Sequence, residues 1–121
     1  MGAAYLIGQA LAVVVWWLGL VLSERVRGWF ELDDGRHRVL SAFVLGDVVV
    51  LAVGSIVAAL ALLRQARSAS QWVAGVAGGC TYSTLYLAAW VALGGDGAIG
   101  LVPMVAATVA TSVIAVDSAG R

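Results

Sequence analysis

Two stretches of the sequence place polar side chains inside apolar segments, where they could bind an ion. The first is the run 78–84, G-G-C-T-Y-S-T, with two glycines and four hydroxyl side chains. If the glycines break a helix at membrane depth, the freed backbone carbonyls and amides form an ion site without a charged side chain. The second is Asp47, a carboxylate followed by an apolar run. A carboxylate at the bilayer centre has a free-energy cost on the order of 3 kcal/mol, which makes it a candidate functional residue.

Each stretch also has an interpretation without ion binding. The small residues of 78–84 suit a packing face between helices, with Ser83 and Thr84 hydrogen-bonded to their own turn. Asp47 lies near the start of its segment, where it would reach the membrane interface or an arginine of the preceding loop. Cys80 is the lone cysteine, so it cannot form an internal disulfide and suits an inert place in the core. The residues alone leave these alternatives open.

The composition is that of an integral membrane protein. Of 121 residues, 62% are hydrophobic and 12% are charged, and the formal net charge is zero. These values predict an all-α membrane protein, and no excess of positive charge points to nucleic acid. The sequence holds no metal-ligand cluster, no nucleophile beside a base and no phosphate-binding loop, so an enzyme is the least supported class.

The apolar residues fall into four segments, each long enough to cross a hydrocarbon layer of roughly 30 Å. We predict one four-span transmembrane domain over residues 1–121, with spans at 5–22, 39–63, 72–93 and 99–116. The third span is predicted to be broken at Gly78 and Gly79. The first is expected to be a span and not a signal peptide, because it lacks a basic start and a small-residue cleavage site. The charged stretch 23–38 predicts a short interfacial helix and a turn, and His37 within it is given no role.

Arginines are nearly balanced between the two ends of such a bundle. Three fall on the side of the N-terminus and four on the other side; in chain order they are Arg64, Arg67 and Arg121, then Arg25, Arg27, Arg36 and Arg38. Because orientation follows the bias of positive charge, this chain could insert either way or pair with an oppositely oriented partner.

Two segments resemble the Fluc (CrcB) family of fluoride channels. Residues 77–85, A-G-G-C-T-Y-S-T-L, lie over a third-helix signature that resembles G-G-x-T-T-F-S-T-F. Residues 45–55, L-G-D-V-V-V-L-A-V-G-S, match the spacing of a second-helix pattern like W-G-T-L-x-V-N-x-x-G-S, and residues 8–17 cover a first-helix pattern weakly. The small multidrug exporters, another four-span group, need a glutamate in the first span, and none precedes Glu24 here.

The resemblance implies an antiparallel dimer that lets fluoride leave the cell through the plasma (inner) membrane. It also implies a sodium ion at the dimer centre, held by the backbone carbonyls of Ala77 and Cys80. The positions that it assigns to the ion path are Tyr82, Ser83, Thr84, Leu51, Leu85 and Asp47.

Several of these positions depart from the family pattern. Leu51 stands where the family has an asparagine that donates to fluoride, and Leu85 replaces the second phenylalanine. Tyr82 keeps the aromatic ring edges that suit an anion. An ionised Asp47, in place of a threonine, would repel an anion at about 6 Å by about 3 kcal/mol at an effective dielectric near 20.

These departures predict a degenerate subunit that pairs with a second, full-motif Fluc-like subunit. A homodimer is disfavoured because it would hold no pore-lining asparagine. Two alternatives stay open: a small transporter of another ion, coupled to a cation through Asp47, and a noncatalytic helper subunit of a membrane complex.

Overall fold

The computed structural model describes residues 1–28, 44–95 and 97–120, and within them the chain is helical, without strands. Apolar runs of about 20 residues satisfy their backbone hydrogen bonds internally as helices. The short helix α2 (Glu24–Arg27) follows the first long helix, and its N-cap hydroxyl, that of Ser23, accepts from the Val26 amide. The other elements are α1 (Gly2–Leu22), η2 (Asp47–Val53), α4 (Gly54–Leu63), α5 (Ala69–Ala92), η3 (Ala98–Gly100) and α6 (Leu101–Ala119).

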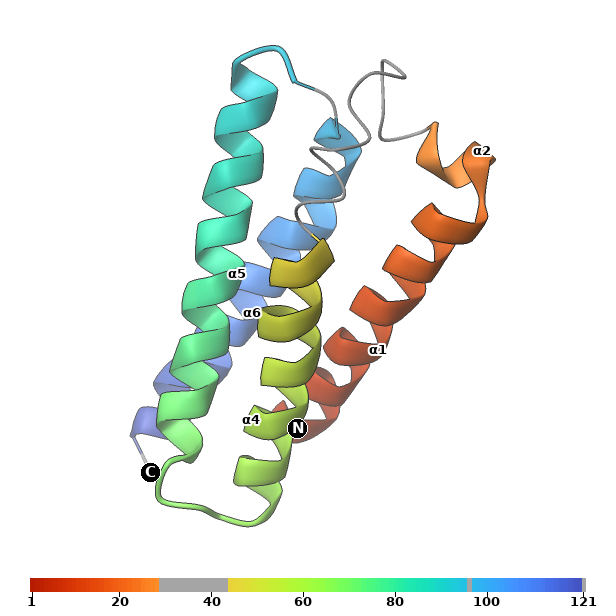
Figure 1. Cartoon of the computed structure of the whole chain (residues 1–121). Coiled ribbons are helices and arrows are strands. Elements are labelled where there is room, and N and C mark those ends of the chain that lie inside the picture. The colour runs from red at the N-terminus through yellow and green to blue at the C-terminus, as the bar shows by residue number, and fades with distance from the viewer. Residues whose placement is uncertain (29–43, 96, 121) are drawn as a thin grey trace.

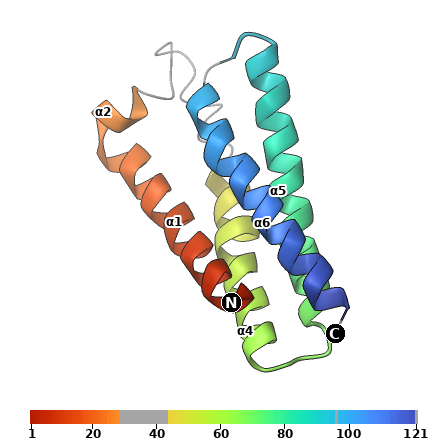
Figure 2. The ribbon, with the colours of Figure 1, turned by 180° about the vertical axis from the view of Figure 1, so that it is seen from behind.

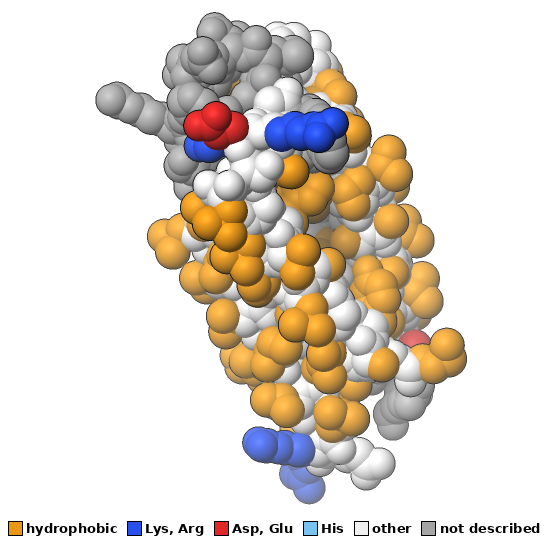
Figure 3. Space-filling view, turned by 90° about the vertical axis from the view of Figure 1, so that its right-hand side faces the viewer, with side chains coloured by type: hydrophobic (Ala, Val, Ile, Leu, Met, Phe, Trp, Pro, Cys, Tyr) orange, Lys and Arg blue, Asp and Glu red, His pale blue; other side chains and the backbone are white. Residues whose placement is uncertain are grey.

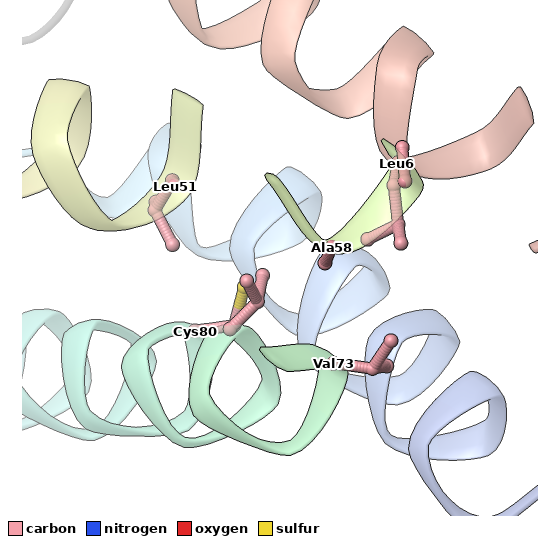
Figure 4. Packing of buried hydrophobic residues seen from close by; sticks show 7 residues of the cluster. Leu6, Leu51, Ala58, Val73 and Cys80 are labelled. Carbon is pink, nitrogen blue, oxygen red and sulfur yellow. The ribbon is translucent and has the colours of Figure 1, made fainter. Parts of the chain in front are cut away.

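The long helices form a bundle in which both chain ends lie at the end that also holds the α4–α5 connection (Figures 1 and 2). Helix α2 lies at the opposite end. Helices α5 and α6 run side by side, while η2 and α4 pack against α1 on one side and α5 on the other. The buried centre is made of small and aliphatic side chains, and Leu51 and Cys80 come together there from η2 and α5 (Figure 4).

Three helical stretches are long and apolar enough to cross a membrane: Gly2–Leu22, Val44–Leu63 and Ala98–Ala119. Hydrophobic side chains cover the middle of the face in Figure 3, and arginines lie at its two ends. The molecule therefore has the surface of a membrane-embedded protein. Helix α5 has 24 residues, about 36 Å, but its polar centre makes it less apolar than these three stretches.

The predicted all-α fold is confirmed for the described residues. Each predicted span corresponds to helical chain, the second one to η2 and α4 together, and helices α1 and α5 each begin three residues earlier than predicted, at Gly2 and Ala69. The predicted interfacial stretch beyond residue 28, with His37, lies outside the described residues, as does the start of the second span at 39–43.

The predicted break in the third span is wrong. Helix α5 runs without interruption through Gly78 and Gly79. A glycine inside a helix costs only about 1 kcal/mol relative to alanine, which tertiary packing readily offsets. A Cβ at Gly79 would overlap Cγ1 of Val50, so this glycine lets α5 approach η2 closely.

The irregular backbone occurs in the preceding span instead. Residues Asp47–Val53 form a π-helix, and the amide of Gly54 donates to the carbonyl of Val49, five residues earlier. Such turns are rare and are found often at functional sites. The irregularity begins at the one carboxylate of this span.

Candidate functional site

A layer of buried polar side chains crosses the middle of the bundle. Each long segment contributes one residue: Gln9 from α1, Ser55 from α4, Cys80 from α5 and Thr111 from α6. The Gln9 amide donates to Ser55 Oγ at 3.1 Å and to Cys80 Sγ at 3.6 Å. Its carbonyl accepts from the Thr111 hydroxyl at 3.2 Å. One amide side chain thus connects all four segments.

The polar side chains of this layer use one another as hydrogen-bond partners, so the layer leaves no polar group of Gln9 free. The two amide protons and the carbonyl of Gln9 are all used, and the sulfur of Cys80 also lies 3.8 Å from the hydroxyl of Thr111. All four residues are almost fully buried. Buried polar groups that are hydrogen-bonded to one another hold the helices in register. They do not offer an ion a route through the middle of the subunit.

We expect Gln9→Met, which keeps the volume and removes the hydrogen bonds, to lower the free energy of unfolding by about 1–2 kcal/mol. Ser55 then loses its donor, while Thr111 keeps the Ala107 carbonyl as an acceptor. Reversible unfolding in mixed micelles measures the loss. In a double-mutant cycle, Ser55→Ala should cost about 0.5–1 kcal/mol less in the Gln9→Met background than in the wild type. Strictly additive losses would contradict the bond between Gln9 and Ser55.

A second set of hydroxyl contacts joins α5 to α6. The hydroxyls of Thr84 and Thr108 lie 2.8 Å apart, and Thr84 also donates to the carbonyl of Met104 at 3.1 Å. Thr84, one of the predicted ion-path residues, is therefore part of the contact between these two helices.

The other predicted ion-path residues point in different directions. Tyr82 and Leu85 are on the outer surface of α5, with 71% and 65% of their area exposed. Leu51 is only 3% exposed and faces the core toward Cys80 (Figure 4). Ser83 is half-buried, and Asp47 lies beside α1 at its contact with Trp17. Within one subunit these residues do not line a common path.

The outer surface of α5 is open along one stripe. A Cβ at Gly75 or Gly78 would meet nothing within 4 Å, and the side chains of Tyr82 and Leu85 follow along the same side of the helix. The ring of Tyr82 lies 6.4 Å from that of Tyr86. We call Gly75, Gly78, Tyr82 and Leu85 the α5 outer face.

The backbone around Ala77 and Cys80 does not fit the sodium site that the resemblance implies. Both residues lie inside the continuous helix α5, and the carbonyl of Ala77 accepts from the Thr81 hydroxyl at 2.8 Å. Carbonyls that take part in a helix point along its axis to their own donors and are not free to surround an ion.

The sequence interpretation gave no role to Gln9, whose side chain makes the hydrogen bonds of the polar layer. Gln9 carries the only amide side chain in residues 5–22, and an amide in a span is a recognised signal for hydrogen bonding between helices. Nothing in the sequence identifies its partners.

No protein-family model, curated protein or solved structure matches this chain. The resemblance to Fluc channels therefore depends on the three short motifs alone.

Proposed function

We propose that this chain is one subunit of a dimeric ion channel in the plasma membrane, with the α5 outer face at the contact between subunits. The observation that carries the proposal is the exposed Tyr82 beside the open Gly78, near the middle of the most polar long helix. A tyrosine hydroxyl facing lipid tails has no hydrogen-bond partner, which is costly. Glycines on a helix surface allow a second helix to approach closely.

The ion path lies between subunits and not inside one of them. The layer around Gln9 closes the interior, while Tyr82 presents its ring to the outside. An aromatic ring edge is the positive part of the ring quadrupole and suits a partly dehydrated anion.

Fluoride is the proposed ion because residues 81–84, T-Y-S-T, resemble the third-helix motif of Fluc channels. The family's asparagine position is Leu51 here, and it faces the core. A full-motif Fluc-like partner supplies the missing asparagine and phenylalanines, so the proposed assembly is an antiparallel heterodimer that exports fluoride passively. The balanced arginines agree with opposite orientations of the two subunits.

Fluoride efflux from liposomes tests this proposal. Three preparations are compared: this chain alone, a four-span partner that carries the asparagine and both phenylalanines, and the two co-purified. We expect efflux from the pair, and we expect Tyr82→Ala in this chain to reduce that efflux by at least about tenfold, equivalent to 1.4 kcal/mol. Thr108→Val, at the α5–α6 contact and away from the α5 outer face, is the control and should leave efflux within about twofold.

Efflux from this chain alone would contradict the heterodimer, because a homodimer holds no asparagine at the Leu51 position. Efflux from no combination would contradict fluoride as the ion. It would favour a transporter of another ion or a helper subunit.

A further inference from the structure

The turn between α4 and α5 brings two arginines to one end of the bundle. Arg64 is the C-cap residue of α4, Arg67 follows it in the turn, and both side chains are exposed. Figure 3 shows arginine side chains together at this end, directly beyond the apolar surface. The acidic side chain visible at the same end lies apart from them. The turn therefore presents two positive charges to whatever surrounds this end of the bundle.

Backbone hydrogen bonds hold this turn in one conformation. The amide of Ala66 donates to the carbonyl of Ala61 at 2.9 Å, and the amide of Gln65 donates to that of Leu62 at 3.1 Å, which is the pattern of a Schellman C-cap. Gln65 takes the left-handed position of this motif, with a φ of 51°. On the other side of the turn, the amide of Ala69 donates to the carbonyl of Ala66 at 2.9 Å. Because the backbone is already ordered, a ligand of the two arginines has only side chains to immobilise.

The neighbouring residues place this turn at the level of the lipid headgroups. The apolar stretch Val44–Leu63 ends directly before Arg64, and the side chain of Leu63 is 63% exposed. On α5, Trp72 is 48% exposed, and Trp90 follows 18 residues later (90 minus 72), about 27 Å along the helix. Tryptophans are enriched at the two boundaries of the hydrocarbon layer, which is roughly 30 Å thick. The two arginines therefore lie just outside this layer, where the phosphates of the lipids are.

We propose that the α4–α5 turn binds the headgroup of an anionic phospholipid, with Arg64 and Arg67 as the cations that contact its phosphate. The planar guanidinium group matches a phosphate with parallel N–H donors, and each arginine near a membrane surface raises affinity for anionic lipid about fivefold. At the opposite end of the bundle, the short helix α2 combines Glu24 with Arg25 and Arg27, so its charges are mixed. The lipid site is independent of the fluoride proposal, because it does not involve the α5 outer face.

Native mass spectrometry of the full chain in detergent micelles, titrated with phosphatidylglycerol, tests the site. We expect the tightest phosphatidylglycerol binding to weaken at least about fivefold when Arg64→Gln and Arg67→Gln are combined. Phosphatidylcholine with the same acyl chains, whose headgroup carries its own cation, should bind the wild type at least about fivefold more weakly than phosphatidylglycerol. The matched control combines Arg25→Gln with Arg27→Gln on α2 and should leave phosphatidylglycerol binding within about twofold.

A second variant separates lost charge from lost structure. Arg64→Lys combined with Arg67→Lys keeps both positive charges, so it should bind phosphatidylglycerol more tightly than the glutamine pair. Equal losses in the two glutamine pairs, or no loss at the α4–α5 turn, would overturn the site. Equal binding of the two lipids would also overturn it, because the acyl chains alone would then account for the binding. Displacement of the lipid by inorganic phosphate at constant ionic strength would assign the arginines to a free anion instead.

Discussion

Gly78→Phe is expected to leave the subunit folded and to lower its affinity for the partner subunit of the proposed dimer by at least about tenfold. A side chain at Gly78 enters open space on the α5 outer face, so it disturbs nothing inside the subunit. In the proposed dimer the same ring would stand between two closely packed helices, where an added large side chain costs 1–3 kcal/mol or more. Photobleaching steps or energy transfer in liposomes, followed as the protein is diluted into lipid, measure the association.

Gly8→Phe is the matched control for this variant. Gly8 is also an exposed glycine with nothing within 4 Å of a Cβ, but it lies on α1. It should leave the dimer unchanged. If Gly8→Phe dissociated the dimer and Gly78→Phe did not, the contact between subunits would lie on α1, and the proposed ion path on α5 would be wrong.

Gly79→Ala is expected to lower the free energy of unfolding by about 1–2 kcal/mol, although alanine favours helices. The added methyl group overlaps Cγ1 of Val50, and a valine in a helix has essentially one preferred rotamer. Val50→Ala removes the obstacle and should restore most of the stability in the double variant. Because Val50 is 40% exposed, Val50→Ala alone should cost little.

Gly78→Ala is the matched comparison for Gly79→Ala, one residue away on the same helix. One residue away, a Cβ meets nothing, so the higher helix propensity of alanine should stabilise the subunit by up to about 1 kcal/mol. Reversible unfolding in mixed micelles compares the two variants directly. Equal changes of the same sign would mean that α5 does not pack against η2 through Gly79.

The helices could be predicted from the sequence because length and apolar content determine a span. The continuity of α5 could not, because two adjacent glycines are compatible with a break and with a close approach between helices. Only the position of Val50 across the contact distinguishes the two. The π-helix at Asp47–Val53 likewise has no signature in the apolar run that forms it.

The polar layer shows why the candidate site was only partly predictable. Gln9 bonds to side chains 46, 71 and 102 residues away, so its partners are determined by the packing of the bundle and not by any local pattern. Cys80 was expected to be an inert core residue, and it is fully buried as expected, but it also accepts a hydrogen bond from Gln9. For Asp47, the sequence indicated a site and the structure adds a neighbour, Trp17.

The polarity of α5 has a consequence for how the chain enters the membrane. Helices that insert one at a time must each be apolar enough to leave the translocon for lipid. We expect α5 to stay at the translocon until α6 has been synthesised, because the hydrogen-bond partners of Thr84 lie on α6, at Thr108 and Met104. The two would then move into the bilayer together as a helical hairpin. Until α6 has been synthesised, the nascent chain is anchored by its first two spans alone.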